Sequence, residues 1–336
     1  MKVLLTGGAG FIGSHVALNL LKRNHDVVIV DNLSNSDKSV VGALEKETKK
    51  HIAFYKIDCC DKIELNKVFK SEKIDAIIHF AGFKAVGESV KKPIMYFKNN
   101  INSALNTIEC GLENDVNLFI FSSSATVYGS CEKMPLSEDS PTGVTSPYGR
   151  TKLVIEEMCK DICTANPKFK AIMLRYFNPI GADSSLVIGE NPKGIPNNLM
   201  PYLCKVATGE LEKLTIFGSD YPTKDGTCIR DYIDITDLAL GHIAALEKAN
   251  TLDNGINVFN LGTGKGVSVT EIVSTFNSVN GNLVPFVYGK RRDGDVAVCY
   301  AECSKANKVL NWKAEHALSE SCRNAYLYNK KKQEKQ

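Results

Sequence analysis

Three glycines near the start of the chain constrain its fold more than any other feature. Gly7, Gly10 and Gly13 stand between an apolar run over residues 3–6 and an amphipathic segment over residues 11–22. Such a run predicts a buried strand, and the apolar residues of the second segment recur with a helical period. Glycine permits the tight turn and the close helix–strand contact that this junction needs. The chain therefore begins with a strand, a sharp turn and a helix.

The same alternation continues through the first half of the chain. Short apolar runs predict further strands, and residues 62–69 predict another helix. Repeated strand–helix units form a parallel sheet with helices on both faces. We therefore expect an α/β protein with a doubly wound parallel sheet, the Rossmann arrangement. The further predicted strands cover residues 26–30, 53–57, 75–80, 118–122 and 171–176.

The second half of the chain has a different pattern. From about residue 178, prolines and glycines interrupt the apolar runs and indicate a loop-rich region. A chain of 336 residues exceeds the usual size of one hydrophobic core. We expect a first domain over residues 1–177 and a smaller α/β domain over residues 178–336. Residues 231–246 predict a strand and a helix, and residues 258–261 predict a strand. These elements leave open whether the chain returns to the first domain over about residues 228–262.

Composition excludes several classes of protein. The 41 basic and 38 acidic residues are too evenly balanced for a nucleic-acid or membrane surface. No apolar run approaches the roughly 18 residues of a spanning helix, and no signal peptide fits before Gly7, so we expect a cytoplasmic protein. Eleven scattered cysteines favour reduced thiols, and Cys159 and Cys163 lack the further ligands of a metal site. The polar tail from residue 329 is expected to be frayed and solvated.

The glycine turn also suits a dinucleotide. Its backbone can approach a pyrophosphate closely, and the N-terminus of the following helix offers free N–H groups to that anion. Asp31 ends the second predicted strand, where a carboxylate can accept hydrogen bonds from both hydroxyls of an adenosine ribose. It would repel a 2′-phosphate, and the next residues, Asn32 and Leu33, offer no arginine to bind one. The pattern favours NAD over NADP.

Tyr148 and Lys152 open a second amphipathic segment and stand four residues apart. On a helix, this spacing places the phenol and the ammonium on one face. A lysine cation beside a tyrosine stabilises the phenolate and lowers its pKa, which would make Tyr148 a general base. Such pairs are common by chance, but Ser124 closes an apolar strand at the edge where ligands of doubly wound sheets bind. The three side chains together predict a catalytic site.

A glycine triplet, a strand-end serine and Tyr-x-x-x-Lys, in this order, resemble the extended short-chain dehydrogenase/reductase superfamily. Within it, four longer strings are similar to the UDP-glucose (UDP-galactose) 4-epimerase family, and the match runs from residue 1 to about 312. The resemblance implies an isomerase that binds NAD and a UDP-sugar and forms a homodimer. The strings are His79-Phe-Ala-Gly-Phe-Lys-Ala-Val-Gly-Glu-Ser89, Phe121-Ser-Ser-Ser-Ala-Thr-Val-Tyr-Gly129, Arg175-Tyr-Phe-Asn-Pro179 and Gly194-Ile-Pro-Asn-Asn-Leu-Met-Pro201.

The resemblance also implies roles for individual residues. Tyr148 would be the base, Lys152 its electrostatic partner and a ribose ligand, and Ser124 the hydroxyl between Tyr148 and the sugar. Two arginines would bind the diphosphate, which suits their planar fork. Besides the glycines, the positions around NAD are Phe11, Ile12, Asp31, Asn32, Asn35, Asp58, Cys59, Phe80, Ala81, Gly82, Lys84, Asn99 and Phe177. The positions that hold the nucleotide diphosphate are Asn178, Asn198, Leu199, Phe217, Arg230, Arg292 and Asp295.

The family's usual Tyr-Gly-Lys-Ser-Lys is Tyr-Gly-Arg-Thr-Lys here, which keeps both catalytic positions. Cys299 falls where some members carry a tyrosine that narrows the sugar pocket, so it resembles the members with wider pockets that also accept N-acetylated sugars. His79 is a lone histidine at a strand end, for which we expect a structural role.

The resemblance implies a reversible oxidation at carbon 4 of UDP-glucose or UDP-galactose, with UDP-GlcNAc and UDP-GalNAc as possible further substrates. The 4-keto sugar would turn over in the site and take the hydride back on its other face, so NAD would stay bound. Two alternatives remain. A 4,6-dehydratase would carry acidic residues after the strand-end hydroxyl, where Ala125 and Thr126 stand here. A non-catalytic NAD-sensing protein would not need the Ser124, Tyr148 and Lys152 set.

Overall fold

Seven parallel strands form the main sheet, in the order β11-β6-β5-β4-β1-β2-β3. The structure is a computed structural model that describes residues 1–131, 133–292 and 294–334. The sheet order reverses beside β1, which creates a crevice at the strand ends. This arrangement confirms the doubly wound α/β prediction. The strands are β1 (Lys2–Thr6), β2 (Asp26–Val30), β3 (Ala53–Tyr55), β4 (Ala76–His79), β5 (Leu118–Ser124), β6 (Lys170–Tyr176) and β11 (Gly255–Leu261).

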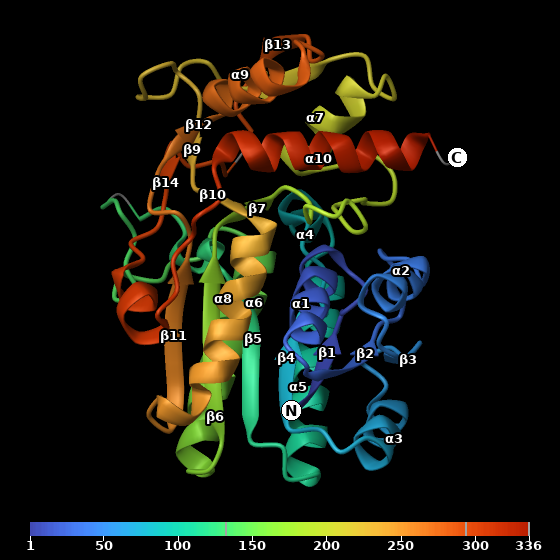
Figure 1. Cartoon of the computed structure of the whole chain (residues 1–336). Helices are drawn as coiled ribbons and strands as arrows, with labels where there is room; N and C mark the ends of the chain where they lie inside the picture. Colours follow the sequence, from blue (N-terminus) through green and yellow to red (C-terminus); the bar gives the residue numbers. More distant parts are fainter. Residues whose placement is uncertain (132, 293, 335–336) are drawn as a thin grey trace.

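Helices cover both faces of this sheet (Figure 1). Successive residues of a strand point to opposite faces, so Val3 and Leu5 join one core while Leu4 joins the other. Because both faces are covered, the strands are apolar without interruption. One face carries α1 (Phe11–Lys22), α2 (Ser39–Thr48) and α8 (Ile235–Lys248), and the other α3 (Lys62–Ser71), α5 (Pro93–Glu113) and α6 (Pro147–Ala165).

Several strand ends differ from the sequence prediction by one to three residues. β3 stops at Tyr55 instead of residue 57, because the chain turns there and the Ile57 N–H donates to the Tyr55 carbonyl at 3.1 Å. β5 continues past residue 122 to Ser124, since its backbone stays paired with Tyr176 of β6. Backbone pairing does not depend on side-chain polarity, so three polar serines can still extend a buried strand.

A smaller unit covers the carboxyl ends of the strands (Figure 1). Its own core includes Met200, Leu203 and Phe276. In contrast, α8 and β11 belong to the larger layer, since β11 pairs with β6 along its length. We keep the division at residue 177, with a return of about residues 228–262, as our proposal for the domain boundaries. The strands and α-helices after residue 177, other than α8 and β11, are β7 (Asn178–Ile180), α7 (Leu199–Ala207), β8 (Leu214–Phe217), β9 (Ile229–Arg230), β10 (Tyr232–Asp234), β12 (Val267–Ser268), α9 (Val269–Asn280), β13 (Phe286–Gly289), β14 (Val298–Cys299) and α10 (Leu318–Gln333).

The remaining elements are short. None of the helices in the described ranges combines the length and apolar character needed to span a bilayer. The short helix α4 (Val86–Lys91) lies beside α5. Three single helical turns complete the elements: η1 (Ala125–Tyr128) follows β5, η2 (Ala249–Thr251) follows α8, and η3 (Ala306–Leu310) precedes α10.

The C-terminal tail is helical, so the expectation of a frayed tail was wrong. α10 runs to Gln333, and residues 335 and 336 of the tail lie outside the described residues. Cys322 and Ala325 of α10 are buried in the smaller core, and the Gln333 side-chain amide donates to the Thr208 carbonyl at 3.1 Å. Packing of these buried residues against the smaller core stabilises the helix. The polar sequence of its last turns does not by itself predict a helix.

Candidate active site

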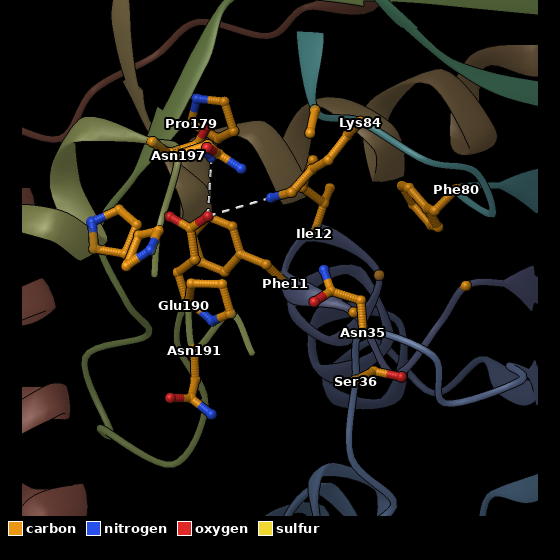
Figure 2. A pocket seen from close by; sticks show the side chains of 18 of the residues that line it. Phe11, Ile12, Asn35, Ser36, Phe80, Lys84, Pro179, Glu190, Asn191 and Asn197 are labelled. Carbon is orange, nitrogen blue, oxygen red and sulfur yellow. Dashed lines mark hydrogen bonds and ion pairs between the residues drawn. The ribbon is translucent and has the colours of Figure 1, made fainter. Parts of the chain in front are cut away.

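One cavity of about 1410 Å³ lies between the strand ends and the smaller unit. The turns after β1, β2, β4 and β5 contribute one side, and α7, β8 and the end of α10 contribute the other. Figure 2 shows part of it. The sequence-predicted site residues that line the cavity are Gly7, Gly10, Phe11, Ile12, Gly13, Asp31, Asn32, Asn35, Asp58, Cys59, Phe80, Ala81, Gly82, Lys84, Asn99, Ser124, Tyr148, Lys152, Phe177, Asn178, Asn198, Leu199, Phe217, Arg230, Arg292 and Asp295.

The turn after β1 leaves no room for side chains. Gly7 has a φ of +70°, and a Cβ on it would lie 2.8 Å from the backbone nitrogen of Ala81. A Cβ on Gly13 would lie 2.6 Å from the carbonyl oxygen of Gly7. Behind this turn, α1 begins after Gly10 with no side-chain cap, so its first N–H groups are available to an anion. The close-packed glycine turn fits the pyrophosphate of a dinucleotide.

Asp31 lies on the cavity wall at the end of β2 with its carboxylate fixed. It is 8% exposed. One oxygen accepts the Ala9 N–H at 3.1 Å, and the other accepts the Leu33 N–H at 2.9 Å and the Ser36 hydroxyl at 2.8 Å. Carboxylate oxygens have further lone pairs for ribose hydroxyls, whereas a 2′-phosphate would meet a negative charge. The residues present therefore fit NAD.

Tyr148 and Lys152 lie in the first turns of α6. The Ser146 hydroxyl accepts the Gly149 N–H at 3.1 Å and caps this helix. Lys152 is 6% exposed; its Nζ donates to the Ser122 carbonyl at 2.6 Å and lies 5.8 Å from the centroid of the Tyr148 ring. The end of β5 thus holds the ammonium beside the phenol, as the helical spacing predicts.

Burial controls the ionisation of this pair. It raises the pKa of Tyr148 to about 12, against a smaller opposite effect of the Ser124 hydroxyl. It lowers the pKa of Lys152 to about 7, against the opposing charge of Glu156. The protein alone therefore does not give Tyr148 the lowered pKa that the sequence predicts, because burial disfavours the charged phenolate. A further positive charge beside Tyr148, such as an oxidised nicotinamide, would favour the phenolate.

The two predicted arginines also reach the cavity. Arg230 of β9 pairs with Asp295, with 3.4 Å between Nη2 and Oδ1. The Arg292 guanidinium lies 4.2 Å from the centroid of the Phe217 ring, a distance typical of a cation–π contact. Two guanidinium groups on one cavity can bind a diphosphate through paired hydrogen bonds.

Comparison with known proteins agrees with this geometry. The model of the NAD dependent epimerase/dehydratase family matches residues 3–262. A UDP-glucose 4-epimerase of Bacillus subtilis is 48% identical over 328 residues, which cover 98% of this chain and 96% of the relative. The chain belongs to the UDP-glucose 4-epimerase family. This membership confirms the resemblance that the four motif strings indicate, and it does not favour the dehydratase alternative.

Solved structures of the family superpose on the whole chain. The UDP-glucose 4-epimerase of Bifidobacterium longum, in complex with NAD+ and UDP, has a TM-score of 0.95 at 45% identity and covers 99% of this chain and 98% of its own. The UDP-Glc/GlcNAc 4-epimerase of Campylobacter jejuni has a TM-score of 0.85 at 39% identity and covers 98% of this chain and 99% of its own. The family's fold and cofactor class therefore extend to this chain.

Cys299 is the sequence-predicted site residue that does not line the cavity in the described structure. It lies on β14, which pairs with β9, and it packs against a buried cluster that contains Ala125 and Phe177. Phe177 itself lines the cavity. Cys299 therefore packs against the cluster that includes the wall residue Phe177 instead of lining the cavity itself.

His79 is a core residue, which confirms the expected structural role. It is fully buried at the end of β4, and its Nδ1 lies 2.7 Å from the Thr6 hydroxyl. Its ring lies beside those of Phe119 and Phe121. Burial lowers the pKa of His79 to about 3, so the neutral form is the stable one.

Sequence reasoning missed two residues of the loop between β7 and α7. Glu190 is 6% exposed, and its Oε1 accepts hydrogen bonds from Lys84 Nζ at 3.2 Å and Asn198 Nδ2 at 3.0 Å (Figure 2). Lys193 lines the same cavity. Both stand just outside the motif strings, so no sequence signal marked them. Lys332 was assigned to the solvated tail, yet it also lines the cavity.

Proposed function

We propose that this protein interconverts UDP-glucose and UDP-galactose by transient oxidation at carbon 4 of the sugar, with NAD as a bound cofactor that is not consumed. The observation that carries the proposal is one cavity that holds the glycine turn, the Tyr148 cluster and the arginine pair. Family membership supports the same reaction. A cofactor site, a base and a diphosphate site are the three parts that this chemistry needs.

Each side chain of the cluster has a separate task. Tyr148 removes the proton of the 4-hydroxyl, and the Ser124 hydroxyl lies between it and the sugar. The Lys152 ammonium stabilises the phenolate and binds the ribose of the cofactor. The glycine turn and Asp31 would hold NAD, which would supply the hydride acceptor for carbon 4 and the hydride donor for the 4-keto sugar. Tyr148 then returns the proton, so the protein ends the cycle unchanged.

The diphosphate site anchors the substrate away from the reacting carbon. Arg230 and Arg292 bind the diphosphate, and the sugar is left free to turn over between the two hydride transfers. Remote binding energy of this kind holds a substrate without restricting its reacting part. The other residues of this site are Asn178, Asn198, Leu199, Phe217 and Asp295.

UDP-GlcNAc and UDP-GalNAc are further proposed substrates. Cys299 stands where some family members carry a bulky tyrosine, and the cluster that it packs against includes Phe177 of the cavity wall. The smaller side chain should leave more room there for an N-acetyl group. The Campylobacter jejuni relative, whose name includes both sugar types, supports the same range.

The proposed state of the protein is a cytoplasmic homodimer without affinity for nucleic acid or membranes. Val86 and Val90 of α4 are 45% and 62% exposed, and Ile94 and Leu105 of α5 are 69% and 42% exposed. Exposed apolar side chains on neighbouring helices are typical of a protein interface. Sedimentation velocity tests the dimer: a single species at the 36.8 kDa of one chain would contradict it.

The function is tested by direct assay and one substitution. The purified protein is incubated with UDP-galactose and, separately, with UDP-GalNAc, without added reductant, and the products are resolved by chromatography. Tyr148→Phe removes the base and should lower kcat by about 100- to 10,000-fold, with bound NAD and thermal unfolding unchanged. Tyr288→Phe removes an exposed hydroxyl outside the cavity and should keep the full rate.

Two results would count against this proposal. Undiminished turnover by Tyr148→Phe would exclude Tyr148 as the base. Failure of the unmodified protein on both substrates, with NAD bound, would refute the epimerase activity and favour a non-catalytic NAD-binding protein.

A further inference from the structure

The loop between β7 and α7 runs along the cavity. Residues 189–193 and 195–198 all line it, and we call residues 189–198 the strap. In Figure 2, Glu190 and Asn191 of the strap lie on the left of the view, Asn35 and Ser36 of the loop after β2 lie on the right, and the Glu190 carboxylate points toward Lys84. The strap thus belongs to the smaller unit but borders the cofactor side.

The strap is fastened at one point to the loop after β4. There the Glu190 carboxylate, which is 6% exposed, accepts the Lys84 ammonium at 3.2 Å. The same oxygen accepts the Asn198 side-chain amide at 3.0 Å, which ties the start of the strap to its end. Opening this fastening would leave a buried carboxylate without its cation, and that is unfavourable.

A second fastening joins the strap to the loop after β2. The Lys193 ammonium donates to the Leu33 carbonyl at 2.8 Å and to the Ser34 carbonyl at 3.4 Å. This loop begins at Asp31, beside the proposed adenosine ribose. Both contacts are exposed to solvent, so the second fastening is the weaker one and would open first.

The electrostatics near the second fastening agree with this contact. Hydrogen bonds from Ser39, and then the charges of Lys193 and Lys332, hold the pKa of Asp37 below its ordinary value. Lys332 belongs to the last turn of α10 and lines the cavity. Two elements of the smaller unit therefore bring positive charge to the loop after β2.

We propose that residues 189–198 retain bound NAD by crossing over it. In the sheet, β4 and β2 lie on either side of β1, so a strap fastened to the loops after both strands passes over the glycine turn. A dinucleotide held at that turn can leave only after a fastening opens. This proposal rests on the proposed function, because it takes NAD as the occupant. A cofactor that is not consumed never has to leave during catalysis, so slow release delays no step.

The test measures NAD release and not turnover. Protein loaded with NAD labelled in its adenine ring is freed of unbound cofactor, mixed with excess unlabelled NAD, and filtered at intervals to count retained label. Lys193→Met keeps the length of the side chain but removes the donor, and it should speed release about tenfold. Lys193→Arg keeps a donor and should release NAD at close to the original rate.

A second substitution addresses the other fastening. Glu190→Gln keeps an acceptor for Asn198 but removes the negative charge that holds Lys84, so it should also speed release. The double variant, Lys193→Met with Glu190→Gln, should release NAD faster than either single variant.

The matched control is Lys213→Met, which removes an exposed lysine paired with Glu212 at 3.7 Å outside the cavity. It should release NAD at the original rate. Equal release from Lys193→Met and Lys213→Met would overturn the proposal, as would equally fast release from Lys193→Arg and Lys193→Met. The assay counts bound NAD and not turnover. The proposal of NAD retention can therefore be refuted while the epimerase activity stands, and it can be supported in a protein without that activity.

Discussion

Asp31 is a buried carboxylate on the cavity wall, and we propose that it selects the cofactor. Three donors from its own chain hold the carboxylate on the cavity wall, from Ala9, Leu33 and Ser36. These bonds do not neutralise its charge. The carboxylate therefore stays available to ribose hydroxyls and repels a phosphate at the same place.

Removing the charge of Asp31 should weaken the choice between cofactors. Asp31→Asn keeps the size of the side chain, and the ratio of NADP to NAD affinity should rise about 10- to 100-fold, as a charge interaction of 1–3 kcal/mol implies. Calorimetric titration of cofactor-free protein gives both dissociation constants. Asp61→Asn, at the exposed start of α3, is the control. An unchanged ratio in Asp31→Asn would mean that another group excludes NADP.

Among the helices, the start of α6 sets the position of Tyr148, the proposed base. Ser146 caps the helix and Pro147 occupies its first position, a sequence that favours a helix start. Tyr148 follows at once, so its phenol is positioned by the first turn, where helices fray most easily. Lys152, one turn further on, is held by the Ser122 carbonyl.

Loss of the Ser146 cap should reduce both stability and turnover. Ser146→Ala removes the bond to the Gly149 N–H and should lower the free energy of unfolding by about 1 kcal/mol. Since the first turn carries Tyr148, kcat should fall roughly 3- to 10-fold. Urea unfolding and the UDP-galactose assay measure the two effects. As a control, Ser268→Ala breaks the capping box of α9 and should lower the free energy of unfolding by a similar amount without changing kcat. If both variants had the same kcat, the α6 cap would not affect turnover through Tyr148.

At the scale of the whole molecule, buried histidines connect the packing to pH. His15 of α1 joins the two units, because its Nε2 accepts the Asp183 N–H at 3.2 Å while Nδ1 lies 2.7 Å from the Phe11 carbonyl. His242 of α8 packs beside Phe80. Burial lowers the pKa of His15 and of His242 to about 4, and that of His79 to about 3.

These histidines should make the protein sensitive to mild acid. Below the unfolded pKa of 6.5, the unfolded state binds protons that the folded state excludes, so stability falls as pH drops from 6.5 towards 4 and is unaffected above 6.5. Each pKa unit corresponds to about 1.4 kcal/mol, so the loss is on the order of 3 kcal/mol per histidine at pH 4. Urea unfolding between pH 7.5 and 5 measures it.

Replacing one of the three buried histidines measures its contribution to the pH dependence of the free energy of unfolding. His242→Leu should make the free energy of unfolding less dependent on pH between 6.5 and 5. His51→Leu, at a side chain that is 87% exposed, should leave the dependence as it is. The same slope in His242→Leu and in the unmodified protein would contradict this account.

Local patterns in the sequence predict much of the fold and of the candidate site. The glycine turn, the parallel strands and the pairing of Tyr148 with Lys152 all depend on spacings within one or two elements, which side-chain periodicity expresses directly. The resemblance adds site positions from both units, and all of these positions but Cys299 line one cavity. Element ends were less predictable, since β5 extends through three serines whose backbone pairing is independent of their side chains.

Short-range spacing is therefore enough to predict the layers, the cofactor class and the Tyr148–Lys152 pair. The raised pKa of Tyr148, the packing of Cys299 against the cluster that contains Phe177, and the helix over residues 329–333 follow only from the folded structure. It also joined Glu190 to Lys84 across 106 positions of the chain and Lys193 to Leu33 across 160. These properties depend on burial and on contacts between distant segments, which exist only when the two units have packed together.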